Sequence, residues 1–229
     1  MVAYGWQVTS AGAAMNTLTK LALGLIGQNK PLPLTGRASA LMRLPAPSRA
    51  GGMPLMEALQ HRQSQRKFST QPLTEQQLSD LLWAAAGVNR PSEGGRTAPS
   101  ALHSQEVDLH VALPNGLHFY DPTQHALRLE VASDVRRVTG YQDFVDHAAL
   151  DLIFVADHTR MKLVPAASRR SYAFTCAGAM AQNVYLFCAS AGLSTVVRAW
   201  FDHAGLSEVM GLSADHELLL AQTVGHPAA

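Results

Sequence analysis

One long stretch without charge limits the folds open to this chain. Residues 171–197 contain no Asp, Glu, Lys or Arg. The stretch is long enough to cross a membrane as a helix, but Gln182 and Asn183 lower its hydropathy, and its flanks show no basic asymmetry. We therefore expect a fully buried helix of a soluble fold over about residues 172–191, ended by Gly192. A helix that is apolar all round needs cover on every side, and a second copy of the chain is the natural source.

The length and charge of the chain favour one large domain and exclude several functions. With 229 residues, 47% of them hydrophobic, the chain can bury a core without metal or disulfide. A net charge of +1 gives no general attraction to nucleic acid or to an anionic membrane. The ten His residues are scattered, so we expect no metal site. Walker loops, dinucleotide glycine fingerprints and nucleophile elbows are absent from the sequence, which disfavours nucleotide hydrolysis and a hydrolytic triad.

Residues 1–50 differ from the rest and are predicted to be an extension before a domain that spans residues 51–229. An export signal is one interpretation, because residues 21–27 are apolar and residues 38–40 have the small-x-small form of a cleavage site. An N-terminal arm that packs on a partner subunit is the other. We expect a cytoplasmic protein, with a periplasmic or otherwise exported one as the alternative.

Residue patterns predict helices combined with an antiparallel meander. Apolar residues at helical spacing predict a helix over residues 53–60, and a capping box at Thr74 and Gln77 predicts a second that ends at Gly87. Residues 89–99 are expected to form a polar loop, a usual place for ligand contacts. The other predicted elements are strands over 106–113, 117–120, 126–131, 150–155, 195–199 and 218–224, short helices over 133–138 and 207–211, and a hairpin turn over 114–116.

A basic segment follows the first of these helices. Residues 62–68 read Arg-Gln-Ser-Gln-Arg-Lys-Phe. If the chain is extended here, Arg62, Ser64 and Arg66 point to one side and present two guanidinium groups and a hydroxyl to one anion, such as a phosphate. The alternative is a solvated helix end whose cations complement the helix dipole. The residues alone leave both interpretations open.

The same segment resembles the Arg-x-Ser-x-Arg/Lys-x-Phe motif of the FMN-dependent nitroreductase family. The resemblance spans about residues 52–227, and the most similar branch is the SagB-type or thiazole-oxidase-type group. It implies an α+β fold in which helices flank a central, mainly antiparallel sheet, and a homodimer with two FMN sites at its interface. The other segments that carry the resemblance are residues 44–47, 51–59, 81–90, 96–100, 182–186, 192–196 and 224–227.

Carried over by position, the resemblance implies that Arg62, Ser64 and Arg66 hold the FMN phosphate, the ribityl chain and the pyrimidine edge of the ring. Gln63 contributes beside them. Positive charge near the pyrimidine edge stabilises the anionic reduced flavin, which is a chemical reason for a cationic side chain at position 66.

The resemblance also assigns residues further along the chain. Ser100 and His103 match a loop that reaches the flavin from the partner subunit. Ala199 and Trp200 match a segment whose backbone amides approach the reactive nitrogen of the flavin. Many family members bind the phosphate with a C-terminal Lys or Arg; this sequence stops before it, and Arg198 is the expected substitute.

The activity that the resemblance implies is a two-step hydride transfer. NADH or NADPH would reduce FMN, and a nitroaromatic, quinone or similar small acceptor would reoxidise it. No side chain is expected to act as a catalytic acid or base, because the flavin carries the chemistry. Two alternatives remain: a flavin-dependent dehydrogenase or oxidase of the SagB type, and a non-catalytic relative that binds a flavin or another small ligand.

Overall fold

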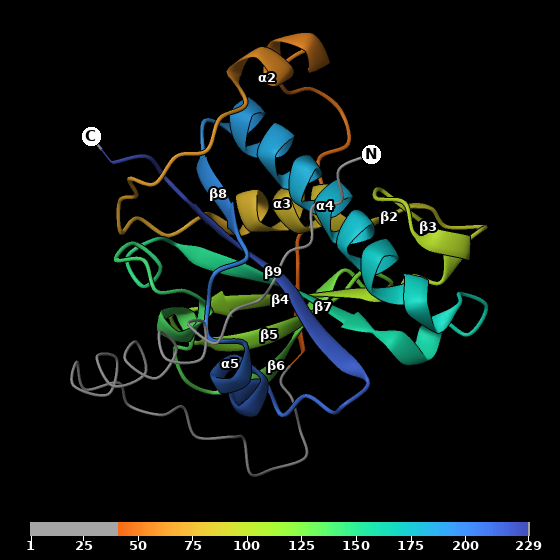
Figure 1. The fold of residues 1–229 in the computed structure, drawn as a ribbon. Helices are drawn as coiled ribbons and strands as arrows, with labels where there is room; N and C mark the ends of the chain where they lie inside the picture. Colours follow the sequence, from red (N-terminus) through yellow and green to blue (C-terminus); the bar gives the residue numbers. More distant parts are fainter. Residues whose placement is uncertain (1–40, 229) are drawn as a thin grey trace, which may run out of the picture. The chain divides into compact units, whose positions relative to one another are not determined.

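The computed structural model describes residues 41–228. Their main sheet has seven strands in the order β1-β6-β5-β4-β7-β9-β8, and each strand runs antiparallel to its neighbours (Figure 1). The strands are β1 (Leu41–Arg43), β4 (Val107–Leu113), β5 (Gly116–Asp121), β6 (Ala126–Val131), β7 (Leu150–Asp157), β8 (Ser194–Arg198) and β9 (His216–Gly225). The helices are α2 (Leu55–His61), α3 (Glu75–Ala86), α4 (Ala166–Ala191) and α5 (His203–Met210), with short 3₁₀ turns η1 (Ala101–His103), η2 (Arg136–Thr139) and η3 (His158–Arg160).

The sheet has a hydrophobic core on each face, and β7 contributes to both. Leu152 and Phe154 pack with α3 and α4, whereas the alternate residues Ile153 and Val155 pack with α5. A strand that is covered on both faces has a continuous apolar sequence, which is why this strand could be placed inside the sheet from its sequence. Figure 1 shows α3 and α4 on one side of the sheet and α5 on the other. The predicted central antiparallel sheet with helices on both sides is confirmed.

Local signals set the ends of α3 and the turn between β4 and β5. The Thr74 side chain accepts a hydrogen bond from the Gln77 backbone, and the Gln77 side chain accepts one from the Thr74 backbone, which confirms the capping box. Leu113 pairs with Gly116 across the predicted hairpin turn. A Cβ atom on Gly116 would lie 2.5 Å from the Val131 carbonyl oxygen, and φ is +147°, so only glycine fits there.

The polar segment over residues 89–99 is more ordered than its composition predicts. It contains a small antiparallel hairpin of β2 (Val88–Arg90) and β3 (Gly95–Arg96). The expectation of a loop without regular structure is therefore wrong for these strands. Strands this short contain too few residues for the apolar alternation that identifies a strand in sequence.

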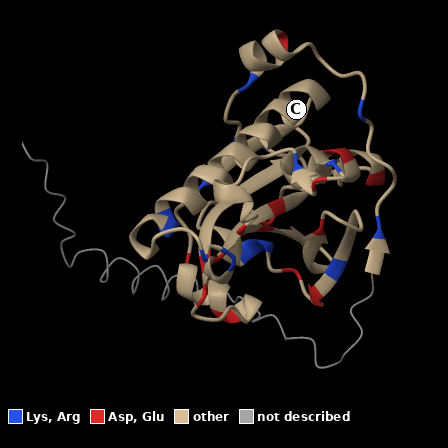
Figure 2. Ribbon diagram, turned by 90° about the vertical axis from the view of Figure 1, so that its right-hand side faces the viewer, with Lys and Arg blue, Asp and Glu red and all other residues tan. Residues whose placement is uncertain are grey.

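The uncharged stretch forms most of α4, which begins earlier than predicted and ends at Gly192 in a left-handed conformation (φ +68°). In Figure 2 its ribbon carries no charged colour beyond the first turns. One side of the helix is buried, but Tyr172, Gly178 and Gln182 are exposed. The expectation of burial all round is thus not met within a single chain. Among residues 41–228, no helix is long and apolar enough to cross a membrane.

The end of the predicted extension takes part in the sheet. Met42 of β1 pairs with Leu127 of β6, and the Ser48 backbone donates to Asp80 of α3. The boundary near residue 50 stays a prediction. The signal-like residues 21–27 and 38–40 lie outside the described part of the chain.

Candidate functional site

The basic segment runs in extended form beside β8. α2 ends at His61, and the Arg62 amide closes its last turn by donating to the Ala58 carbonyl (2.9 Å). The Gln65 amide then donates to the Thr195 carbonyl of β8 (3.0 Å), and Phe68 forms a bridge with Pro227. The extended conformation that the alternating pattern requires is therefore present, and β8 with the C-terminal segment holds it in place.

A tyrosine in α4 ties this segment to the sheet. The Tyr185 hydroxyl lies 2.7 Å from Ser64 Oγ and accepts a hydrogen bond from the Val197 amide (3.0 Å). The Arg62 guanidinium lies over the Tyr185 ring at 5.2 Å, a cation–π contact. Arg62 and Ser64 thus meet at one side chain, which fixes their position relative to α4 and β8.

Arg66 lies beside an open, aromatic-lined cavity of about 760 Å³. Two ring pairs line it: Phe68 packs on Phe144 at 5.4 Å between centroids, and Tyr141 packs on Trp200 at 5.3 Å. Lys67 and His147 add polar groups to the same wall. Flat aromatic walls beside cations suit a planar ring that carries negative charge. Gln63 lines a different cavity, of about 240 Å³, near the end of α4.

Arg198 is not available in the way that its predicted role requires. Its side chain is 4% exposed and forms an ion pair of 2.5 Å with Asp151, which is fully buried. Arg198 also donates to the Thr139 carbonyl (2.6 Å) and to the Thr223 hydroxyl (2.8 Å). Burial lowers the pKa of Arg198 and raises the pKa of Asp151, and the opposite charge of each counters the shift of the other. These contacts disfavour a phosphate contact by Arg198 and indicate a structural role.

The two residues after β8 face the solvent. Ala199 is exposed, and the Trp200 side chain is 58% exposed at the rim of the aromatic-lined cavity. Trp200 therefore lines the same cavity as Arg66, and Ala199 precedes it in the chain.

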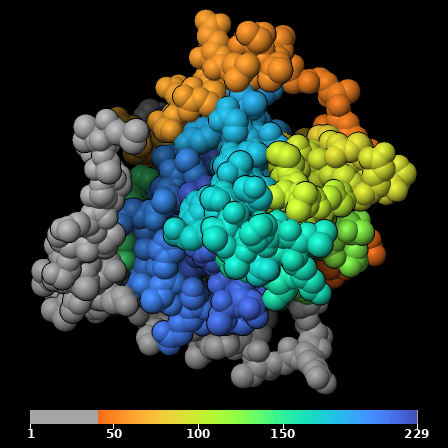
Figure 3. Space-filling model, turned by 45° about the vertical axis from the view of Figure 1, so that its right-hand side comes forward, coloured from red at the N-terminus to blue at the C-terminus, as the bar shows by residue number. Residues whose placement is uncertain are grey.

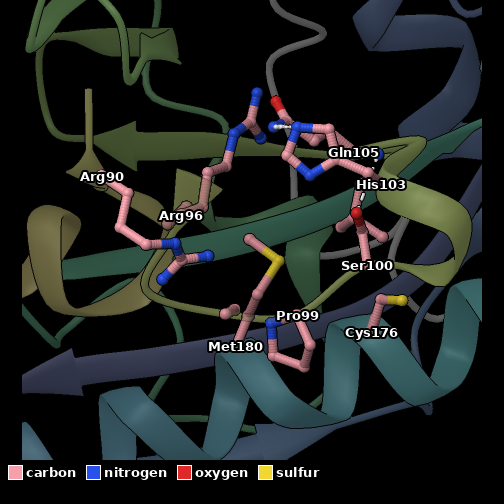
Figure 4. A pocket seen from close by; sticks show the side chains of 11 residues that line it. Arg90, Arg96, Pro99, Ser100, His103, Gln105, Cys176 and Met180 are labelled. Carbon is pink, nitrogen blue, oxygen red and sulfur yellow. Dashed lines mark hydrogen bonds between the residues drawn. The ribbon is translucent and has the colours of Figure 1, made fainter. Parts of the chain in front are cut away.

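Ser100 and His103 lie in a second cluster, shown in Figure 4. They line a cavity of about 240 Å³ together with Arg90, Arg96 and Gln105, against Cys176 and Met180 of α4. The Gln105 amide donates to Ser100 Oγ (3.0 Å), and the Gln105 side chain donates to the Gly94 carbonyl (2.7 Å). Burial and the nearby Glu106 raise the pKa of the Cys176 thiol to about 12, so it is not a nucleophile at neutral pH.

The loop that carries Ser100 and His103 has a strained backbone. Leu102, His103 and Gln105 all have positive φ, at 50°, 58° and 48°. Residues other than glycine rarely adopt positive φ angles, and such backbone strain is concentrated at functional sites. The loop is therefore a candidate functional element on conformational grounds alone.

The predicted site residues fall into two groups that contact different turns of α4. The first group includes Arg62 and Ser64 and meets the helix at Tyr185, whereas the second includes Ser100 and His103 and meets it at Cys176 and Met180. The site residues predicted from the sequence do not include Tyr185, Arg90, Arg96, Tyr141 or Phe144. A signal existed for Tyr185, which is a polar ring within an uncharged helix and within a segment that matches the family.

The fold and the basic segment beside β8 define the class of protein: an α+β chain of the nitroreductase type. A model of the family described as "Nitroreductase family" matches residues 59–226, and the chain belongs to this family. It is 32% identical over 177 residues to a protein of Methanocaldococcus jannaschii provisionally named a nitroreductase, covering 72% of this chain and 88% of that protein.

Two solved structures extend the comparison. A crystal structure of a provisionally named nitroreductase from Ralstonia eutropha is 51% identical, with a TM-score of 0.82, and covers 89% of this chain and 97% of that chain. The NADPH:FMN oxidoreductase of Vibrio harveyi, in complex with NAD⁺, is 22% identical with a TM-score of 0.57, and covers 76% of this chain and 69% of that chain. The second likeness concerns the fold alone.

Proposed function

We propose that this chain is an FMN-dependent oxidoreductase that uses NADH or NADPH to reduce a nitroaromatic, a quinone or a similar small acceptor. The observation that carries the proposal is the geometry of the basic segment, residues 62–68. Arg62 and Ser64 both contact Tyr185, and Arg66 lies beside an aromatic-lined cavity. Family membership supports it, and so does the name of the V. harveyi protein of the same fold, which includes both FMN and NADPH.

The residues of this site fit FMN. Neither Arg62 nor Arg66 forms an ion pair with another described residue, so both charges are free to meet a phosphate or the ring edge. The cavity of about 760 Å³ beside Arg66 is in the usual range for cofactor sites, about 300–1,000 Å³. Gln63 lies between the two arginines in sequence but lines the separate cavity near the end of α4, so it does not contribute to this fit.

When bound, FMN supplies the chemistry by accepting a hydride and passing electrons to the acceptor. The chain contributes binding and electrostatics. Arg62 and Ser64 hold the phosphate end, Arg66 places positive charge at the ring, and the aromatic wall with Trp200 orients a flat substrate. The main chain at Ala199 and Trp200 supplies amide donors beside the cavity.

Homodimerisation belongs to the proposal. Ser100 and His103 contact a different part of α4 from the basic segment, which supports a loop that reaches the site of a partner subunit rather than the site of its own chain. Two exposed surfaces support an interface: the uncharged face of α4, and α2, where the exposed fraction is 63% for Leu55 and 76% for Met56. Figure 3 shows α2, α4 and the β2–β3 hairpin on one face of the molecule.

The test begins with a visible spectrum of the purified protein. We expect a flavin band that bleaches anaerobically with NADH or NADPH and returns when 1,4-benzoquinone is added. Arg62→Ala should lose bound FMN, whereas Arg43→Ala, which removes an exposed cation from β1, should retain it. Protein that binds no FMN on reconstitution would contradict the proposal. A flavin that stays oxidised with both nicotinamides would contradict the donor and favour the dehydrogenase or oxidase alternative.

A further inference from the structure

The cavity beside Ser100 and His103 contains two cations that the proposed function leaves unused. Arg90 and Arg96 come from the two strands of the β2–β3 hairpin, where Val88 pairs with Arg96 and Arg90 with Gly95. Both line this cavity, and in Figure 4 the Arg90 side chain ends on the Met180 side, whereas the Arg96 side chain runs toward His103 and Gln105. The hairpin therefore brings two guanidinium groups to one small cavity.

Within residues 41–228, the Arg96 guanidinium has no acceptor for its hydrogen bonds. Its side chain is half-buried and makes no hydrogen bond or ion pair with any residue of the described chain. Desolvation lowers its pKa, and the nearby Arg160 lowers it further, while Asp108 opposes these effects. Asp108 is already engaged, because it accepts two hydrogen bonds from the Arg160 guanidinium. An arginine in this position gains from any anion that enters the cavity.

The Arg90 guanidinium packs closely against Gly95. A Cβ atom on Gly95 would lie 2.5 Å from Nε and from Nη2 of Arg90. Among residues 41–228, the Arg90 guanidinium has a hydrogen bond to Asn89 and a weak surface ion pair, 3.6 Å from Glu93, whose side chain is 72% exposed. Arg90 thus has donors to spare for a ligand.

The remaining walls favour a small ligand with an apolar body. Met180 and Val107 line the cavity on its apolar side, and His103 and Gln105 line it on its polar side. A volume of about 240 Å³ lies below the range of about 300–1,000 Å³ that is typical of drug-sized ligands. The cavity can hold a small acid, or one anionic group of a larger molecule, but not a dinucleotide.

We propose that Arg90 and Arg96 form an anion subsite that binds a carboxylate or phosphate of the molecule reacting at the flavin. The inference rests on the proposed function, in which Ser100 and His103 of the same cavity reach the flavin of the partner subunit. Two molecules could supply the anionic group: a small acceptor that carries a carboxylate, and the nicotinamide dinucleotide, which carries phosphates. The volume favours the acceptor.

Calorimetric titration with benzoate tests the subsite without turnover. Arg96→Gln and Arg90→Gln should each weaken benzoate binding about tenfold, as expected for the loss of a charge-assisted hydrogen bond. Arg43→Gln removes the same charge from exposed β1 and should leave the dissociation constant unchanged. Gly95→Ala keeps both arginines but displaces the Arg90 side chain, so it should also weaken binding. Equal affinity in all variants, or no binding to the unmodified protein, would overturn the subsite.

Measuring FMN in the same preparations separates this inference from the proposed function. Protein without FMN that still loses benzoate binding in Arg96→Gln would retain the subsite and reject the flavin role. Protein that retains FMN but binds benzoate equally well with and without the Arg90 and Arg96 charges would support the flavin role and reject the subsite.

Steady-state kinetics then identify the source of the anion. We expect Arg96→Gln to raise KM for 4-nitrobenzoate about tenfold while KM for the neutral 4-nitrobenzamide changes little. A rise confined to NADPH, with NADH unaffected, would support the subsite and assign it to the 2′-phosphate that NADPH carries and NADH lacks. An equal rise for all four substrates would overturn it.

Discussion

The Tyr185 hydroxyl serves two partners at once, and this makes it a sensitive point of the site. It accepts from the Val197 amide and contacts Ser64 Oγ, so Tyr185→Phe leaves one donor and one hydroxyl without their partner. We expect a loss of about 1–3 kcal/mol in the free energy of unfolding and weaker FMN binding. Thr123→Val removes an exposed hydroxyl from the turn between β5 and β6 and should change neither quantity. Urea denaturation and flavin titration of both variants measure the difference, and equal behaviour would exclude the linking role.

The buried pair of Arg198 and Asp151 predicts a large effect on stability. Arg198→Met leaves the Asp151 carboxylate buried without its counter-charge, which costs about 3–5 kcal/mol. Thermal melting should show this as a much lower Tm. Replacing both residues, by Arg198→Met with Asp151→Leu, should recover part of the loss because no unpaired charge remains. FMN lost from Arg198→Met at a temperature where the fold is intact would instead support the phosphate role first assigned to Arg198.

At the scale of single residues, the sequence predicts how neighbouring side chains are arranged better than it predicts which distant residue a side chain contacts. The alternation in residues 62–68 allowed an extended anion site beside the alternative of a solvated helix end, because spacing within seven residues determines which side chains share a side. The fate of Arg198 depends on Asp151, 47 residues away, and no local pattern indicates that pairing. Arg90 and Arg96 were placed in a loop by composition, and only the hairpin brings them to one cavity.

At the scale of elements, Glu217 connects β9 with α4 and η3. Its carboxylate accepts hydrogen bonds from Arg170 (2.6 Å) and from His158 (3.0 Å). Burial acts to raise the pKa of Glu217, but these two hydrogen bonds and the charges of the same partners together lower it below its ordinary value. The connection therefore stabilises the fold only while Glu217 is ionised.

The sign of this shift sets the pH range of a third prediction. A carboxyl with a lowered pKa in the folded state stabilises above its unfolded pKa, about 4.3, and this contribution is lost as pH falls through the folded pKa. Glu217→Gln should cost about 1 kcal/mol or less at pH 7, because Arg170 is mostly exposed, and the difference should vanish near pH 3. Urea denaturation at pH 7, 5, 4 and 3 checks this; a difference that grows on acidification would contradict it.

Helices and strands were predictable where a local signal sets them. The capping box of α3 and the turn before β5 depend on residues a few positions apart, and both occur as predicted. The burial of α4 was not predictable, because an uncharged helix has the same sequence whether its second side is covered by the same chain or by another. Residues 41–228 cover only one side of the helix.

For the whole molecule, the exposed uncharged face of α4 leads to a prediction about assembly. Gly178 lies on this face, and a Cβ atom added there would meet no atom within 4 Å in the single chain. Gly178→Glu should therefore fold, because glycine inside a helix makes the helix less stable than most other residues do. The substitution also places a negative charge in the proposed interface. We expect a monomer by light scattering, with Tm retained and FMN lost, because the partner's loop no longer completes the site. Ala167→Glu adds the same charge at the start of α4 and should remain a flavin-bound dimer; a dimeric Gly178→Glu would place the interface elsewhere.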